Sequence, residues 1–144
     1  MSKSSGSGKV VHHVARSFAA QSMMETLGAT LQQAADGMAE ITAPIGPGVR
    51  QQAGFGHAGL TFSIGDSAAG YAALSLLQPD EEVLTTEMKI NLVAPAKGDY
   101  LRARGRVEKP GRRLMVVTAR VEAVTGDKET LVALLQGTML PLRP

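Results

Sequence analysis

The chain has 144 residues, a formal net charge of +2 and no cysteine. This length fits one domain with one hydrophobic core, and the lack of thiols excludes disulfides, cysteine nucleophiles and cysteine-ligated metals. The small charge and the few aromatic residues (two Tyr and three Phe) argue against a nucleic-acid partner, and no apolar stretch reaches the roughly 20 residues that span a bilayer. We therefore expect a cytoplasmic protein with no nucleic-acid or membrane partner.

The first part of the chain is predicted to hold one helix and one hairpin. Residues 1–13 have no apolar segment typical of a secretory signal and are interpreted as a flexible tail. Residues 14–27 place apolar side chains on one helical face. Residues 30–34 and 38–43 are predicted strands, and the Asp36-Gly37 pair between them is a strong hairpin signal.

A long apolar helix is predicted next, over residues 58–77. It contains no proline and is apolar on nearly all sides, so it should be buried rather than lie on a surface. Its lone charged residue is Asp66. Gly65, beside it, costs about 1 kcal/mol relative to alanine in a helix, which indicates that something packs closely there, such as a second subunit.

Four strands are predicted to follow, over residues 83–93, 100–108, 114–124 and 131–140. Polar and apolar residues alternate along them, as in a sheet that is solvated on one side. Arg102, Arg104 and Arg106 share one face of the second of these strands. We interpret this face as solvated, so truncation of Arg102 or Arg104 is expected to change stability little.

The element order is therefore helix, two strands, one apolar helix and four strands. A half-solvated sheet needs an apolar partner, and the apolar helix needs a cover. The predicted class is α+β, with a six-stranded antiparallel sheet wrapped around one long central helix and preceded by an N-terminal helix. This is the hotdog fold, and it forms a single domain over residues 14–144.

The start of the central helix and Asp66 are the candidates for chemistry. Gly54, Gly56 and Gly59 cluster where the helix begins, and a helix N-terminus offers free N–H groups that can hold an oxygen gaining charge during acyl transfer. A buried carboxylate needs a partner, a water-filled cleft or a catalytic task. From the residues alone, Asp66 can equally be a structural carboxylate that pairs with an arginine or bonds to backbone across a subunit contact. His57 is best explained as a residue that holds the turn, and Gln51 is a solvated loop amide by default.

Six short motifs occur in a fixed order between residues 15 and 142: His57-Ala58-Gly59, Asp66-Ser67-Ala68, Thr-Glu-Met-Lys-Ile-Asn at 86–91, Pro95-Ala96, Gly-Arg-Arg at 111–113 and Gln-Gly-Thr at 136–138. Together they resemble the PaaI-type hotdog thioesterases of phenylacetic acid degradation. Each motif is short, but the occurrence of all six in this order makes the resemblance specific.

The resemblance implies a role for each site residue. The Ala58 N–H would bind the thioester carbonyl, and Asp66 of the other subunit would attack it or activate a water. Gln51 would help to place the water or the carboxylate, His57 would shape the turn, and Ser67 would bond substrate or carboxylate. Ala58 replaces the first glycine of the family's His-Gly-Gly pattern, so its Cβ is expected to affect acyl-group preference more than catalysis.

The resemblance also implies an acyl-CoA substrate with a small or aromatic acyl group, hydrolysed to free acid and CoA. No metal and no tightly bound cofactor are expected. Lys97, Arg112 and Arg113 are candidates for binding the CoA phosphates. A sheet around one helix leaves edge strands to protect, so we expect a homodimer, and the resemblance implies a dimer of dimers.

Two alternatives remain at this point. A hotdog dehydratase or hydratase would pair a carboxylate with a histidine, as Asp66 and His57 can, although the proline-rich signature of acyl-carrier dehydratases is missing around His57. A non-catalytic acyl-CoA-binding protein is the other alternative, and the presence of Asp66 in its motif argues against it.

Overall fold

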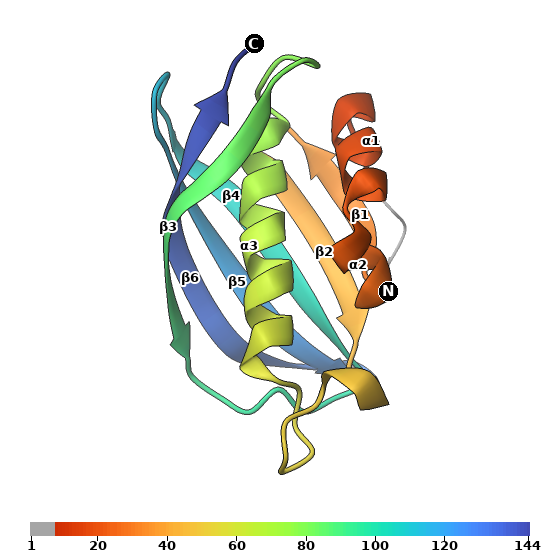
Figure 1. Cartoon of the computed structure of the whole chain (residues 1–144). Helices are drawn as coiled ribbons and strands as arrows, with labels where there is room; N and C mark the ends of the chain where they lie inside the picture. The colour runs from red at the N-terminus through yellow and green to blue at the C-terminus, as the bar shows by residue number, and fades with distance from the viewer. Residues whose placement is uncertain (1–7) are drawn as a thin grey trace.

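A curved sheet of six antiparallel strands wraps around one long helix in the computed structural model, which describes residues 8–144 (Figure 1). The strand order is β1-β2-β4-β5-β6-β3. This is the hotdog fold expected from the sequence. The elements are α1 (His12–Ala20), α2 (Ser22–Thr26), β1 (Thr30–Ala35), β2 (Met38–Pro44), the 3-10 turn η1 (Pro47–Val49), α3 (Ala58–Leu74), β3 (Glu82–Leu92), β4 (Tyr100–Pro110), β5 (Met115–Thr125) and β6 (Lys128–Leu142).

The hairpin between β1 and β2 forms at the predicted Asp36-Gly37 pair. Asp36 has φ 56° and Gly37 has φ 79°, and Ala35 pairs with Met38 across the turn. Two positive φ angles in a two-residue loop match the twist of antiparallel strands, and Asp-Gly adopts them at low cost. The prediction of this turn is confirmed.

Small residues let the sheet lie close to α3. A Cβ on Gly105 of β4 would collide with the backbone of Ala68, which is fully buried. Gly65 faces Leu135 and Val121 of the same chain's sheet. The interpretation of Gly65 as a contact with a second subunit is therefore wrong: the glycine makes room for the sheet.

The N-terminal region differs from its prediction in two ways. The single helix over residues 14–27 is interrupted at Gln21, whose φ of −86° and ψ of 95° separate α1 from α2. Residues 9–11, expected in the tail, instead pair with β1, because Ala34 N–H donates to the Lys9 carbonyl and Val11 N–H donates to the Ala34 carbonyl. The rest of the expected tail, residues 1–7, lies outside the described residues.

This pairing covers the β1 edge of the sheet and leaves β3 at the other edge. The exposed apolar side chains of the β3 region include Leu84, Leu92 and Val93, which are 53%, 51% and 53% exposed. A strand edge with exposed apolar side chains is a site for pairing with another chain. Among the described residues, no helix is long and apolar enough to cross a membrane.

The arginine face of β4 carries a network of ion pairs rather than isolated solvated side chains. Arg102 contacts Glu129 at 3.0 Å and Glu40 at 3.5 Å, and its side chain is only 15% exposed. Arg104 contacts Glu122 at 2.9 Å and is 47% exposed. The expectation of a solvated face is therefore wrong for Arg102, because neighbouring strands cover its guanidinium.

We expect the two arginines to differ in their effect on stability. Arg102→Ala should lower the free energy of unfolding by about 1–2 kcal/mol, because it removes the packing of a largely covered side chain and one of the two cations that Glu40 and Glu129 share. Arg104→Ala should change it by less than about 0.5 kcal/mol, because the Arg104 side chain is 47% exposed and Arg102 still contacts Glu40 and Glu129 in the variant. Urea unfolding of both variants measures this difference, and equal midpoints would contradict it.

Candidate active site

The loop before α3 is held in place by its own side chains. Arg50 donates to the carbonyls of Ile45 at 2.6 Å and Gly54 at 3.0 Å. Gln51 Oε1 accepts hydrogen bonds from the Phe55 N–H at 3.3 Å and from the Ala53 N–H. The carbonyl end of Gln51 therefore fixes the loop, which leaves its NH₂ end for other partners.

The first residues of α3 present a free backbone donor. His57 is the N-cap, and its Nδ1 accepts the Gly59 N–H at 2.7 Å. His57 thus holds the turn. The hydrogen bonds of the described residues include none from the Ala58 N–H, and Ala58 and Gly59 are exposed. An unpaired N–H at a helix N-terminus is suited to bind an oxygen that gains negative charge.

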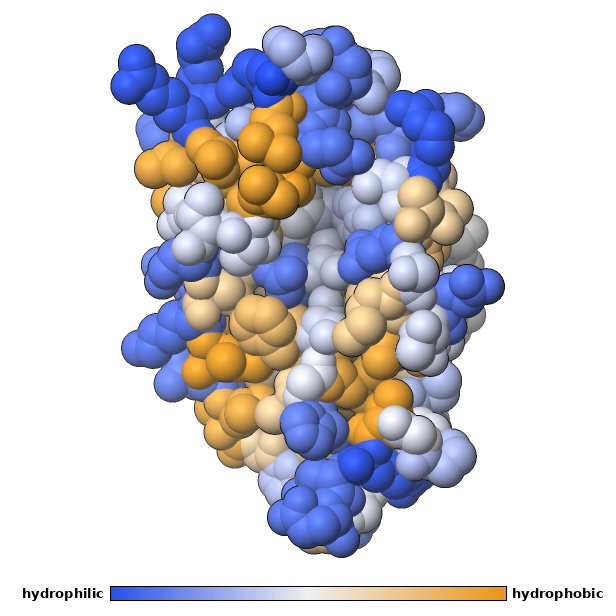
Figure 2. All heavy atoms as spheres, in the orientation of Figure 1, coloured by the Kyte–Doolittle hydropathy of each residue, from blue (hydrophilic) through white to orange (hydrophobic). Residues whose placement is uncertain are grey.

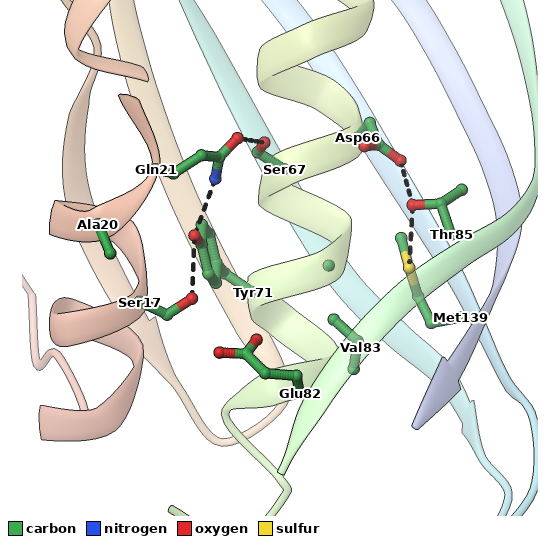
Figure 3. A pocket seen from close by; sticks show the side chains of 11 residues that line it. Ser17, Ala20, Gln21, Asp66, Ser67, Tyr71, Glu82, Val83, Thr85 and Met139 are labelled. Atoms are coloured by element: carbon green, nitrogen blue, oxygen red, sulfur yellow. Dashed lines mark hydrogen bonds between the residues drawn. The ribbon is translucent and has the colours of Figure 1, made fainter. Parts of the chain in front are cut away.

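Asp66 lies two turns further along α3 and is half-buried. Thr85 of β3 donates its hydroxyl to Asp66 Oδ1 at 2.7 Å (Figure 3). Burial raises the pKa of Asp66 above its usual 3.8, and the Thr85 hydrogen bond opposes that rise. No arginine or lysine among the described residues pairs with Asp66, so the ion-pair alternative is not seen within this chain.

Sequence reasoning missed Thr85. It lies just before the Thr-Glu-Met-Lys-Ile-Asn motif, and only the position of β3 beside α3 brings it to Asp66. Ser67 was expected to bond substrate or carboxylate. Within this chain its hydroxyl donates to Gln21 Oε1 at 3.3 Å and so points toward the junction of α1 and α2, away from the Asp66–Thr85 pair (Figure 3).

The structure does not bring all the predicted site residues together in one chain. Ala58 and Asp66 are eight positions apart on one helix, which separates them by about 12 Å along the axis at about 1.5 Å per residue. Gln51, Ala58 and Gly59 lie at the start of α3, whereas Asp66 and Ser67 lie near its middle. One thioester carbonyl cannot contact both groups of a single chain.

The candidate phosphate-binding residues are also divided. Lys97 follows Ala96, whose carbonyl accepts the Gly56 N–H beside the start of α3. Arg112 and Arg113 lie between β4 and β5. The Arg112 carbonyl accepts a hydrogen bond from Arg143. Arg143 also forms an ion pair with Glu81, which lies just beyond the end of α3. All three candidate side chains are exposed, but they occupy opposite ends of the domain.

A pocket of about 300 Å³ opens beside Asp66. It belongs to a groove that runs over α3 between β3 and the two N-terminal helices (Figure 2). Its walls come from α1 and its junction with α2, from α3, from β3 and from β6. The lining residues are Ser17, Ala20, Gln21, Asp66, Ser67, Gly70, Tyr71, Glu82, Val83, Thr85 and Met139.

Among residues 8–144, no group of three or more His, Cys, Asp or Glu side chains is placed to hold a metal ion. The reactive group in the pocket is thus the half-buried carboxylate of Asp66, aligned by one hydroxyl. A free backbone N–H lies at the start of the same helix, within the hotdog fold.

Comparison with known proteins gives the family. Residues 53–130 match the Thioesterase superfamily, and the chain belongs to this superfamily. A relative from Deinococcus radiodurans named "Putative esterase" is 30% identical over 83% of this chain and 79% of its own length. A Pseudomonas aeruginosa relative, also named a "Putative esterase", is 31% identical over 58% of this chain, and the match spans only 60% of that protein.

Solved structures support the same assignment. A thioesterase family protein from Silicibacter pomeroyi is 40% identical, with a TM-score of 0.90 over 92% of this chain and 98% of that one. A Bacillus halodurans protein solved with CoA is 26% identical, with a TM-score of 0.73 over 91% and 87%. The Escherichia coli PaaI protein, at 20% identity and a TM-score of 0.81 over 94% and 97%, shows the shared fold alone.

Proposed function

We propose that this protein is an acyl-CoA thioesterase of the PaaI type that hydrolyses a small or aromatic acyl-CoA to the free acid and CoA. The observation that carries the proposal is the separation of Ala58 and Asp66 by about 12 Å on one rigid helix. Ala58 supplies a hydrogen-bond donor but no carboxylate, and Asp66 supplies a carboxylate but no free backbone donor. A ligand can reach both groups. A complete site forms when Asp66 of one subunit faces the partner's Ala58.

A homodimer with twofold symmetry provides this arrangement. Among residues 8–144, no strand pairs with the outer edge of β3. Antiparallel pairing of two β3 strands joins two sheets into one. The two α3 helices then lie side by side in opposite directions. The side of α3 that this chain leaves partly open carries Phe62, Ser63, Asp66 and Ser67, and it would face the partner. Assembly of two dimers into a tetramer is a further proposal that rests on the family resemblance.

The reaction follows from these positions. The thioester carbonyl oxygen binds the partner's Ala58 N–H at the helix N-terminus, which stabilises the negative charge as it develops. Thr85 fixes one carboxylate oxygen of Asp66, and the other oxygen attacks the carbonyl carbon or removes a proton from the attacking water. The free NH₂ of the partner's Gln51 helps to hold that water or carboxylate. The C–S bond breaks, and CoA leaves as a thiolate.

The nucleophile and general-base routes differ in where oxygen from water first enters. In a single turnover with ¹⁸O-labelled water, label in the Asp66 carboxylate shows the nucleophile route, because it enters there only when water hydrolyses an acyl anhydride at the aspartyl carbon. The general-base route places the label in the released acid. Mass spectrometry of the peptide that contains Asp66 distinguishes the two.

The remaining parts of the proposal concern binding and location. The CoA-bound Bacillus halodurans structure supports CoA as the leaving group. Lys97, Arg112 and Arg113 remain candidates for the phosphates, with the two arginines and the partner's Lys97 brought closer by antiparallel pairing of the subunits. No cofactor is proposed, and the absence of cysteine supports the cytoplasm as the location.

A thiol-release assay with a panel of aryl- and alkyl-CoA thioesters tests the proposal. Because the chain has no cysteine, a thiol reagent reports only the released CoA. Hydrolysis of at least one thioester is expected. Hydration of crotonyl-CoA without CoA release would instead favour the dehydratase or hydratase alternative, and binding of acyl-CoA without turnover would favour a non-catalytic protein.

The pH dependence should reveal the ionised form of Asp66. Since burial raises its pKa, kcat/KM should fall as the pH drops through a value above 3.8. Thr85→Ala removes the bond that holds this pKa down, so the acid limb should move to higher pH, whereas Thr85→Ser should retain the original profile. If kcat/KM of the Thr85→Ala variant falls at the same pH as that of the wild type, this role for Thr85 is contradicted.

A further inference from the structure

Four hydrogen-bonded side chains form a polar wall at one end of the pocket (Figure 3). Gln21 Nε2 donates to Tyr71 Oη at 2.8 Å, and Ser17 Oγ donates to the same oxygen at 3.3 Å. Ser67 Oγ donates to Gln21 Oε1 at 3.3 Å. The break between α1 and α2 occurs at Gln21, so the interruption of the helix is what turns this amide toward α3.

The polar wall has unused hydrogen-bonding capacity. The Tyr71 hydroxyl accepts two hydrogen bonds, and among the described residues nothing accepts its own hydrogen. If the bond to Ser17 runs in the opposite sense, the Ser17 hydrogen is the one left over. Tyr71 is only 6% exposed. A buried hydroxyl normally donates its hydrogen to an acceptor, so an oxygen atom of a ligand is a suitable partner.

Besides the polar wall and the side chains of Asp66, Glu82 and Thr85, the pocket has an aliphatic part. Ala20, Val83 and Met139 provide apolar walls. Gly70 lies one turn after Asp66, and a Cβ there would meet no atom closer than 3.7 Å. Such a Cβ would only touch Val83 and Met139, so the glycine does not crowd the pocket. The free volume of about 300 Å³ lies beside Asp66 and α3 and suits a hydrocarbon chain that runs from Asp66 toward the polar wall.

The charges of the pocket exclude one class of acyl group. Asp66 and Glu82 both line it, and no lysine or arginine is among the lining residues. A second carboxylate at the far end of the acyl group would be repelled by these two groups. The polar wall itself is neutral, so it suits a neutral oxygen.

Building on the proposed thioesterase function, we propose that the pocket holds the acyl group and that Tyr71 and Gln21 select aliphatic acyl groups with a hydroxyl far from the thioester. The hydroxyl oxygen accepts the spare hydrogen of the wall, and the spare acceptor sites of the wall take the hydroxyl hydrogen. This replaces the aromatic acyl groups of the proposed function with aliphatic hydroxyacyl groups as the substrate class.

Matched pairs of thioesters test the selection. The hydroxylated members are 6-hydroxyhexanoyl-CoA, 8-hydroxyoctanoyl-CoA and 10-hydroxydecanoyl-CoA, and the controls are heptanoyl-CoA, nonanoyl-CoA and undecanoyl-CoA, in which a methyl group replaces the hydroxyl. At least one pair should show a preference in kcat/KM of about tenfold or more for the hydroxylated member. Ratios near one in all three pairs would overturn the proposal.

Variants then assign the preference to the polar wall. Tyr71→Phe keeps the ring that packs on Phe18 and should reduce the ratio of kcat/KM toward one. Tyr100→Phe is the matched control, since its hydroxyl accepts a bond from Arg102 away from the pocket, and it should keep the wild-type ratio. A ratio that Tyr71→Phe leaves intact would overturn the role of Tyr71. Gln21→Met provides a second variant if Tyr71→Phe unfolds.

A binding experiment separates this proposal from the thioesterase proposal. Neutral amides, 8-hydroxyoctanamide and nonanamide, are titrated into the wild-type chain and followed by NMR. If no thioester is hydrolysed, the thioesterase proposal fails, yet tighter binding of the hydroxylated amide that is lost in Tyr71→Phe would still support the polar wall. Equal binding of the two amides would overturn it.

Discussion

Asp66→Asn should lower kcat/KM for thioester hydrolysis by at least about a hundredfold. The amide can neither attack the carbonyl nor accept a proton from water, but it keeps the shape of the side chain and a carbonyl oxygen for the Thr85 hydroxyl, which lies 2.7 Å from Asp66 in the native chain. Thiol release under saturating and limiting substrate measures the effect. Asp127→Asn, an exposed change in the turn between β5 and β6, is the matched control and should leave activity unchanged.

The fold of the Asp66→Asn variant should remain intact. Because burial raises the pKa of Asp66, its folded-state pKa lies above its unfolded value. The stability linked to its protonated form is present at low pH and is lost as the pH rises through the folded pKa. A neutral asparagine avoids this loss, so the variant should unfold at no lower temperature than wild type at pH 7. Wild-type activity in a folded variant would rule out Asp66 as the catalytic carboxylate.

A mixture of two inactive variants should recover activity if the site is shared between subunits. Asp66→Asn lacks the carboxylate. Ala58→Pro lacks the backbone donor, and proline is tolerated at the first position of a helix, where its N–H has no helical partner. The preceding residue, His57, has φ −66° and ψ 144°, which is compatible with a following proline. Losing one such donor should cost about a hundred- to a thousandfold in kcat.

Heterodimers of these variants contain one intact site, formed by Asp66 of the Ala58→Pro chain and Ala58 of the Asp66→Asn chain. After random exchange of equal amounts, about half of the dimers are mixed, and each has one working site of two, so about a quarter of wild-type activity should return. Co-refolding followed by thiol release measures this. If subunits exchange and no activity returns, the carboxylate and the donor do not act across the interface.

The size of the active species gives an independent check on the shared site. Light scattering should report a mass of at least twice the 15.1 kDa chain. An active species with the mass of one chain would exclude the shared site, whatever the mixing experiment shows. Dilution until dimers dissociate should also abolish activity, because Ala58 and Asp66 of one chain stay about 12 Å apart along α3.

The amino-acid sequence by itself determines the architecture, since the signals that encode it are local. Alternation of polar and apolar residues predicts the strands, the Asp36-Gly37 pair predicts its hairpin, and the apolar run that contains Asp66 predicts the central helix. The motif order also pointed to the superfamily and to Ala58 and Asp66 as candidates. The strands, the hairpin and the helix each depend on residues close together in the sequence, whereas the motif order depends on residues spread from 57 to 138.

Only the tertiary structure decided which side chains meet. Thr85 reaches Asp66, and Gln21 reaches Tyr71 and Ser67, across 19, 50 and 46 positions of sequence. Packing between elements that are distant in sequence also explains why Gly65 faces its own sheet and why neighbouring strands cover Arg102. The spacing of residues along a strand or helix fixes the face on which a side chain lies, but the element that packs on that face is set by the sheet order and by long-range burial.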